Sequence, residues 1–326
     1  MLRLVGILIT VLFAIATAVL VWPQFFHLED TFPIAQIIAS RALVIGAFLV
    51  VAVLALLLLI ARPLRGFAAS ILIVALLGAG ATGVVGALRG VGTGALPAKT
   101  DAALRVLTWN TNGAAVSAEQ IAKVIEEQQV DVVALPETSE KVGERIALMM
   151  RQAGNPMWVH NVNIRPDVSN GPQAWQTTIL ISAKLGNYSV IESSRDGSSN
   201  TGSVPSVVAM PVSGKGPTIV AVHAVAPREK AMSRWKSDLA WIADQCPAGD
   251  FILAGDFNST LDHMASFGDD GGTMGRCRDV ASTTGNGMLG TWPASVPALL
   301  GAPIDHIMAS ENWRATGSEV LEDAGG

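Results

Sequence analysis

Seven polar residues that could carry chemistry lie in, or directly after, apolar runs typical of β-strands. They are Asn110, Asn112, Glu137, His223, Asp256, Asn258 and Asp305. Loops held by rigid strands are where catalytic groups are usually placed. Carboxylate and amide oxygens are hard ligands of the kind that Mg²⁺ takes, and Asp or His can transfer a proton when the geometry is right. These residue types fit metal-assisted chemistry, provided that the fold brings them together.

Short strands and one helix are expected to position the first of these groups. Residues 104–110 predict a strand that ends in a polar loop, and residues 131–135 predict a buried strand whose carboxyl end delivers Glu137. Between them, Ser117 and Gln120 have the spacing of a capping box, and apolar residues then recur on one face. A helix is therefore expected between the two strands.

The rest of this region predicts more strands and a second helix. Strands are expected at 177–182, 206–212, 218–224, 250–254 and 304–308, and a helix from about 229 to 244. Strands this numerous, with mixed connections, suggest an α+β fold of two packed sheets flanked by helices. About 220 residues is enough for one sizeable core.

Four short motifs follow one another along the chain. They are Trp-Asn-Thr-Asn-Gly at 109–113, Pro-Glu-Thr at 136–138, Gly-Asp-Phe-Asn at 255–258 and Ile-Asp-His-Ile at 304–307. In type and order they resemble the endonuclease/exonuclease/phosphatase superfamily, which has the deoxyribonuclease I-like fold. The resemblance implies a four-layered α/β/β/α sandwich whose edge holds a divalent metal, usually Mg²⁺, and hydrolyses a phosphate ester. Mn²⁺ and Ca²⁺ are the alternative metals.

The resemblance also implies ligands for the metal and the phosphate. Glu137 would be the principal metal ligand, assisted by Asn112 or Asn110. Asn258 and Asn110 would hold phosphate oxygens. Asn110 and Asn112 could instead be ordinary turn residues after a strand.

Three further residues would handle protons in such an enzyme. Asp256 would orient the attacking water or accept its proton, His223 would contact the phosphate or protonate the leaving oxygen, and Asp305 would orient the family's acid/base histidine. That histidine belongs to a Ser-Asp-His motif that this sequence lacks, and His306 would point to the opposite face of its strand. We expect a carboxyl-terminal truncation of an active enzyme, with natural loss of the histidine as the alternative. His223 could also be a purely structural histidine.

The amino-terminal part of the chain has a different character. Three apolar segments, at about 4–22, 39–61 and 67–88, are each long enough to cross the ~30 Å hydrocarbon core of a bilayer. They predict a transmembrane anchor over residues 1–90, a Gly, Ala and Thr-rich linker over 91–103 and a catalytic domain over 104–326. The first segment could instead be a cleavable signal peptide, because Arg3 precedes its apolar core. The two further spans favour the anchor.

Short loops predict the orientation of the anchor. The loop between the second and third segments carries Arg62 and Arg65, whereas the loop around residues 27–30 carries no Lys or Arg. Basic loops usually stay in the cytoplasm, so the catalytic domain is expected outside a cell membrane that the chain crosses several times. Arg41 and Arg89 are exceptions to this scheme.

Charge limits the range of partners. The part of the chain beyond residue 90 contains 17 basic and 25 acidic residues and therefore has a net charge of −8. The domain therefore lacks the positive field on which nonspecific duplex binding relies. Nucleic acid fits the resemblance but not the charge, a nucleotide is a further candidate, and a lipid headgroup suits the anchor.

Two points stay open at this stage. Cys246 and Cys277 permit one disulfide in an exported domain, or two reduced thiols. A catalytically impaired domain that binds a phosphorylated ligand or a protein partner at the cell surface is the alternative function. For the enzyme itself, the partners expected are the bilayer and a phosphoester, and no protein partner is inferred.

Overall fold

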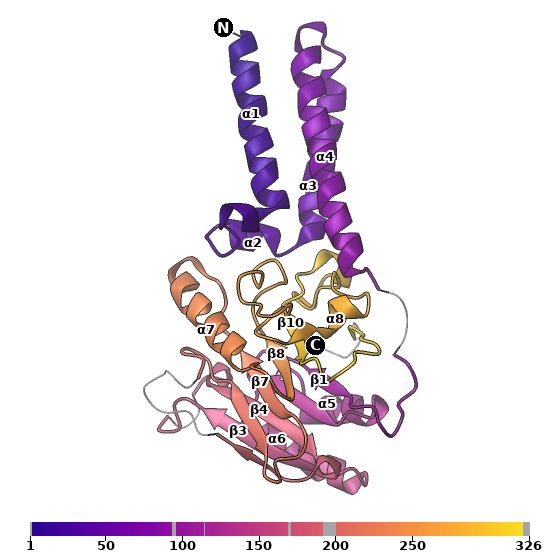
Figure 1. Cartoon of the computed structure of the whole chain (residues 1–326), viewed down its shortest axis with the longest axis vertical. Coiled ribbons are helices and arrows are strands. Elements are labelled where there is room, and N and C mark those ends of the chain that lie inside the picture. Colours follow the sequence, from indigo (N-terminus) through magenta and orange to yellow (C-terminus); the bar gives the residue numbers. More distant parts are fainter. Residues whose placement is uncertain (1, 93–95, 114, 169–170, 192–199, 322–326) are drawn as a thin grey trace.

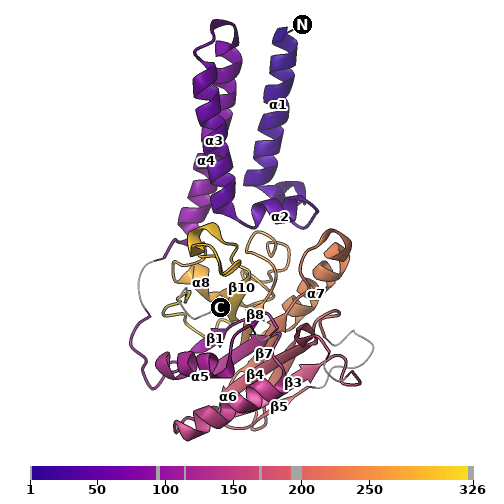
Figure 2. The same ribbon diagram turned by 180° about the vertical axis from the view of Figure 1, so that it is seen from behind.

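Three long helices rise from a domain built of two sheets (Figures 1 and 2). The computed structural model describes residues 2–92, 96–113, 115–168, 171–191 and 200–321. The long helices are α1 (Leu2–Val21), α3 (Arg41–Leu58) and α4 (Arg65–Arg89). Each is long and apolar enough to cross a membrane, in agreement with the three predicted segments.

Short elements connect these helices at both ends. The connection between α1 and α3 contains the 3₁₀ turn η1 (Pro23–Phe26) and the helix α2 (Ile34–Ile38), and it lies at the end that faces the domain (Figure 1). The connection between α3 and α4 contains η2 (Arg62–Leu64) and lies at the far end. The basic loop of the sequence is thus the tip farthest from the domain.

The first sheet has four strands in the order β1-β2-β4-β3. These strands are β1 (Val106–Thr108), β2 (Val132–Pro136), β3 (Met157–Asn163) and β4 (Gln176–Ser182). β1 and β2 are parallel, and the other pairs are antiparallel. All residues of β2 are buried, as its continuous apolar run predicts.

The second sheet has six strands in the order β5-β6-β7-β8-β10-β9. They are β5 (Tyr188–Val190), β6 (Val207–Pro211), β7 (Thr218–His223), β8 (Phe251–Asp256), β9 (Arg278–Asp279) and β10 (Asp305–Ala309). β7 and β8 are parallel and lie at the centre. Buried side chains of both sheets, among them Val132, Ile179, Ile219 and Ala254, form the core between them.

Helices cover the outer faces of both sheets. α5 (Ala118–Glu127) and α6 (Glu140–Gln152) pack on the first sheet, and α7 (Met232–Asp244) packs on the second. The remaining short elements are α8 (Val280–Thr283), η3 (Gln173–Trp175), η4 (Ala183–Leu185), η5 (Glu229–Ala231) and η6 (Ala298–Leu300). The layers run α/β/β/α, so the predicted sandwich is confirmed.

Every strand and helix that the sequence predicts in the domain is present. α5 begins at the predicted capping box, in which Gln120 N donates to Ser117 Oγ and Ser117 N donates to Gln120 Oε1. The sequence analysis missed the helices α2, α6 and α8 and the strands β3, β5 and β9. β3 and β5 are only partly buried, and β9 has two residues, so none of the three has a clear apolar period.

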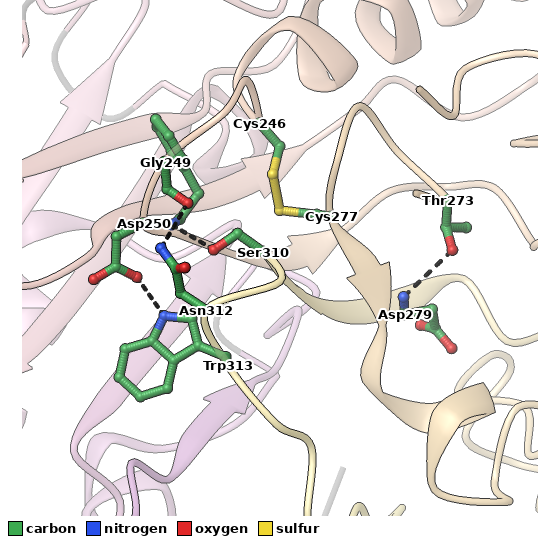
Figure 3. Close-up of a disulfide and its surroundings, with 10 residues drawn as sticks. Cys246, Gly249, Asp250, Thr273, Cys277, Asp279, Ser310, Asn312 and Trp313 are labelled. Atoms are coloured by element: carbon green, nitrogen blue, oxygen red, sulfur yellow. Dashed lines mark hydrogen bonds between the residues drawn. A yellow bond between two sulfur atoms is a disulfide. The ribbon is translucent and has the colours of Figure 1, made fainter. Parts of the chain in front are cut away.

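A disulfide joins the end of α7 to the residue before β9 (Figure 3). Cys246 and Cys277 have an S–S distance of 2.00 Å and Cα atoms 5.9 Å apart. Beside it, Asn312 Nδ2 donates to Gly249 O at 3.2 Å, which holds the chain after β10 against the start of β8. The two cysteines are thus paired.

The residues directly after α4 are hydrogen-bonded to the domain. Gly92 N donates to Gly285 O at 2.9 Å, Gly287 N donates to Arg89 O at 2.9 Å, and Met288 N donates to Gly90 O at 3.0 Å. Gly90 has φ 85°, and a Cβ there would meet the Gly285 carbonyl oxygen at 2.1 Å. Only glycine permits this approach, and the first residues of the expected linker lie against the domain.

Candidate functional site

Three neighbouring strands of the second sheet place His223, Asp256 and Asp305 side by side. The register pairs His223 with Asp256 and Asp256 with Asp305. Residues two positions earlier in β7 and β8, Ala221 and Ala254, lie in the core between the sheets. Because side chains alternate along a strand, His223 and Asp256 face the first sheet, and Asp305, opposite Asp256, does so too.

The first sheet contributes Asn110 and Glu137 to the same place. Asn110 Nδ2 donates to Asp256 Oδ2 at 2.9 Å and to Glu137 Oε1 at 3.3 Å, so one amide joins the two sheets. His223 Nε2 lies 3.9 Å from Glu137 Oε1. Five of the seven predicted site residues therefore surround one point at the edge of the sandwich.

Three buried threonines hold the backbone at Glu137. Glu137 has φ 57°, a left-handed conformation that costs a non-glycine residue about 1–3 kcal/mol unless its surroundings enforce it. Thr111 Oγ1 donates to Glu137 O at 3.0 Å and lies 2.8 Å from Thr138 Oγ1, and Thr178 Oγ1 donates to Thr138 O at 2.8 Å. The sequence analysis gave Thr111 and Thr178 no role, because only the pairing of distant strands brings them to Glu137.

Asn258 is held by contacts that also orient Asp256. Its backbone N–H donates to Asp256 Oδ1 at 2.8 Å, and its Nδ2 donates to Ala224 O at 2.8 Å. Trp235 Nε1 donates to Asn258 O at 3.0 Å. One amide hydrogen of Asn258 remains for a ligand, since a side-chain NH₂ has two donors.

Asn112 lies apart from this group. Its backbone N–H donates to Asn110 Oδ1 at 2.9 Å, and its side chain is exposed. Within the part of the chain that the structure describes, that side chain makes no hydrogen bond to another predicted site residue. Of the two asparagines proposed to assist Glu137, Asn110 is the one in contact with it.

The carboxylates are crowded. Burial raises the pKa of Asp256, and the nearby carboxylates of Asp305 and Glu137 raise it further. Burial also raises the pKa of Asp305, whose backbone N–H donates to Thr291 Oγ1 at 3.1 Å. Asp305 Oδ1 is buried and has no hydrogen-bond partner among the described residues. A cation near this cluster would offset the repulsion between the carboxylates.

The donor set fits a hard metal ion. No three His, Cys, Asp or Glu side chains converge as a metal-binding group in the ranges that the structure describes. Mg²⁺ does not require such a group, because one or two carboxylates, waters and substrate phosphate commonly complete its shell. Glu137 offers a partly exposed carboxylate, and the unpartnered oxygen of Asp305 lies in the same cluster.

His223 is neutral at physiological pH. Burial lowers its pKa to about 3, so its approach to Glu137 is not an ion pair. Its backbone N–H donates to Ser206 Oγ at 3.0 Å. Nδ1 is buried without a hydrogen-bond partner in the described residues. A neutral imidazole at this position can donate one hydrogen bond and accept one.

His306 belongs to the opposite face of the sheet, as strand alternation predicts. Its Nδ1 lies 2.8 Å from Asp279 Oδ1, and its Nε2 lies 2.9 Å from Ser259 O. Burial acts to lower the pKa of His306, but the Asp279 carboxylate outweighs this effect and the pKa is raised above 6.5. His306 is therefore a buried structural residue directed away from the site.

Comparison with known proteins identifies the family of the chain. The model of the Endonuclease/Exonuclease/phosphatase family matches residues 107–326. A family protein from Leptotrichia buccalis is 15% identical with a TM-score of 0.45, and covers 64% of this chain and 88% of its own. An AP endonuclease from Archaeoglobus fulgidus is 14% identical with a TM-score of 0.43, covering 64% and 88%. The human Nocturnin catalytic domain is 16% identical with a TM-score of 0.41, covering 64% and 83%. No curated protein matches the chain.

Proposed function

Because this chain belongs to the endonuclease/exonuclease/phosphatase family, we propose that it is a membrane-tethered, extracytoplasmic, metal-dependent phosphoesterase. Its substrate would be a phosphodiester or a phosphomonoester. One observation carries the proposal: Asn110 joins Glu137 of the first sheet to Asp256 of the second at the edge where the family motifs meet. The helices α1, α3 and α4 would provide the tether.

The contacts of each site residue suggest its role in hydrolysis. Glu137 would hold Mg²⁺, with Asn110 or Asn112 assisting, and the bound ion would polarise the phosphoryl group. Asp256, fixed through both carboxylate oxygens by Asn258 N and Asn110 Nδ2, would orient the attacking water. The free amide hydrogen of Asn258 would hold a phosphate oxygen.

His223 and Asp305 complete the proposed site. His223 is neutral and can donate a hydrogen bond to the phosphate without carrying a charge of its own. Asp305 lies opposite Asp256, and the two carboxylates would share one proton, since two adjacent buried carboxylates do not both ionise readily.

Three observations support the proposed orientation. Arg62 and Arg65 lie at the tip far from the domain, together with the amino terminus (Figure 1). Arg41 and Arg89 lie at the near end, but both pair with Asp262 and so add little free positive charge there. The Cys246–Cys277 disulfide suits an oxidising compartment.

The activity is tested with the protein, helices included, in detergent with Mg²⁺ and a soluble chromogenic phosphodiester or phosphomonoester. Glu137→Gln should abolish metal-dependent hydrolysis. Glu140→Gln, at an exposed acidic residue three positions later, is the matched control and should retain it. Equal turnover by both variants would refute the metal assignment.

The orientation is tested separately by alkaline phosphatase fused after the last residue. An exported domain makes the fusion active. An inactive fusion of normal abundance contradicts export, whatever the outcome of the hydrolysis assay.

A further inference from the structure

The edge that carries the candidate site also carries the loops that touch the proposed anchor. After β8, His263 Nε2 lies 3.0 Å from Ala35 O. Thr260 N donates to His263 Nδ1 at 2.9 Å, so Nε2 carries the proton and donates to the anchor. Before β10, Leu300 O accepts from Ser40 Oγ at 3.0 Å. The strands that deliver Asp256 and Asp305 thus run directly into contacts with the helices.

A buried ion-pair cluster fixes this arrangement. The Asp262 carboxylate accepts from Arg41 Nη2 at 2.5 Å and Nε at 2.8 Å, and from Arg89 Nη1 and Nη2 at 2.8 Å each. Arg41 begins α3 and Arg89 ends α4. The side chains of Asp262 and Arg41 are 2% and 3% exposed. Because a buried charge network tolerates little displacement, the catalytic edge is held toward the ends of the spans.

Exposed apolar side chains lie on both sides of this contact. We call them the membrane-facing patch: Trp22, Phe25, Trp292, Val296, Leu299 and Leu300, which are 37–63% exposed. Trp22 directly follows α1, and η6, which contains the two leucines, packs against the start of α3. Trp292 is 61% exposed.

The bilayer is the occupant that fits this patch. Trp22 follows α1 and η6 packs against α3, so both parts of the patch adjoin helices apolar enough to span a membrane, and exposed apolar patches commonly mark a partner or membrane surface. Tryptophan is the side chain enriched at the membrane–water boundary. A water-soluble polyanion is a poorer fit, because the part of the chain beyond residue 90 has a net charge of −8, which repels it.

We propose that the substrate is a phosphoester carried by a membrane lipid, presented to the site while residues 291–303 rest in the headgroup layer. The inference rests on the proposed function and narrows its substrate. Thr291 provides the link: it precedes the exposed Trp292, and its Oγ1 accepts from the backbone N–H of Asp305 at 3.1 Å. One loop thus contacts the lipid surface and supports a site carboxylate.

The reaction is an ordinary hydrolysis. Water oxygen bonds to phosphorus as the bond from phosphorus to one ester oxygen breaks. One proton of the water ends on the leaving oxygen, and the other is released or held by the new phosphate. No oxidant or second substrate is needed.

A depth measurement tests the surface without relying on turnover. Both native cysteines are in the disulfide, so Val296→Cys provides a single site for a spin label in the full-length protein reconstituted into phosphatidylcholine vesicles. Ser213→Cys, in the exposed β6–β7 turn at the opposite edge of the sheet, is the control. The label at 296 should be far more accessible to oxygen than to a water-soluble nickel chelate, relative to the label at 213. Equal water accessibility of both labels would overturn the docking of the patch.

A rate comparison tests the substrate class. Wild type, Trp292→Ala and Trp158→Ala are assayed with Mg²⁺ on the soluble chromogenic esters, and on phosphatidylcholine vesicles containing phosphatidylglycerol or phosphatidic acid. Trp158 is an exposed tryptophan of β3, away from the patch, and serves as the matched control. Trp292→Ala should lower the ratio of lipid to soluble hydrolysis about tenfold, the effect of losing one buried aromatic anchor, whereas Trp158→Ala should leave it unchanged.

The outcomes separate the two proposals. If the wild type hydrolysed none of the substrates, the proposed function would be refuted. The depth measurement would still decide whether the membrane-facing patch inserts into the bilayer. Glu137-dependent hydrolysis of the soluble ester alone, or equal ratios in the two tryptophan variants, would overturn the lipid substrate and leave the phosphoesterase intact.

Discussion

Neutralising Asp262 should undock the anchor from the catalytic domain. Asp262→Asn keeps the size of the side chain but leaves Arg41 and Arg89 without their carboxylate. Within the part of the chain that the structure describes, the guanidinium of Arg41 then keeps its contacts from Nη1 to Leu20 O and Val21 O, at 2.9 and 3.2 Å. Breaking a buried ion pair by removing one partner costs about 3–5 kcal/mol. Arg89 is 18% exposed, so solvent reduces its share and the lower half of that range is the better expectation.

The cost should appear in local opening and leave the sandwich folded, because Arg41, Arg89 and Asp262 lie outside its three apolar cores, to which the described part of the anchor contributes Ala35 alone. The amides of Gly92, Gly287 and Met288 donate across the contact and report on it. A cost of about 3 kcal/mol predicts hydrogen exchange there roughly a hundredfold faster, since each 1.4 kcal/mol is a factor of ten. The measurement is hydrogen exchange by mass spectrometry on protein in nanodiscs.

An exposed ion pair across the same contact supplies the control. Lys236 Nζ lies 2.6 Å from Asp30 Oδ2 and is 49% exposed, so Lys236→Ala should change exchange by less than about fivefold. The effect of Asp262 also depends on pH. Burial alone would raise its pKa, but the two arginines hold the pKa below 3.8, so docking is strongest above about pH 4 and weakens as the pH falls. If Asp262→Asn exchanged no faster than Lys236→Ala, the cluster would not hold the two parts together.

Three further predictions concern the domain itself. Replacing Cys246 and Cys277 together by Ser removes a disulfide that closes a loop with a sequence separation of 31. The free energy of unfolding, measured by denaturant titration, should fall by about 3–4 kcal/mol. A loss below about 1 kcal/mol would contradict this expectation. The raised pKa of His306 means that its pair with Asp279 stabilises the fold fully below about pH 6.5 and is lost as the pH rises through the folded pKa. Stability should therefore fall as the pH rises above about 6.5, and less so in Asp279→Asn; equal slopes would refute the pairing. Thr138→Val removes a hydroxyl that supports the turn at Glu137, the proposed metal ligand. It should reduce kcat/KM about tenfold on the soluble ester with the fold unchanged by circular dichroism; full activity would show that the turn holds without it.

Much of the framework is encoded locally. The apolar runs of α1, α3 and α4 and the continuous run of β2 are visible in the sequence because burial sets their composition over adjacent residues. Asp256 and Glu137 could be assigned to one site in advance, since one ends a strand, the other follows one, and their motifs occur in the order of the family. α6 has apolar residues on one face and could have been found by the same reasoning.

The docking of the anchor could not be predicted in this way. Arg41 and Arg89 were exceptions to the charge rule in the sequence, and their partner Asp262 lies 221 and 173 positions away. No local pattern identifies such a partner, because it depends on how the loop after β8 folds back. The same holds for Thr178, whose role depends on the register of β4 against β2.

The pairing of Gly90 and Gly92 with the loop at 285–288 determines how far the enzyme can reach. An unattached stretch from 90 to 103 could extend by about 45 Å and let the domain sample a wide volume above the membrane. With its first residues bonded to the domain, that freedom is gone. In a bilayer, encounters would then be set by lateral diffusion of the substrate and its density per unit of membrane area, so turnover should follow the mole fraction of substrate in the membrane and stay insensitive to dilution of the vesicles.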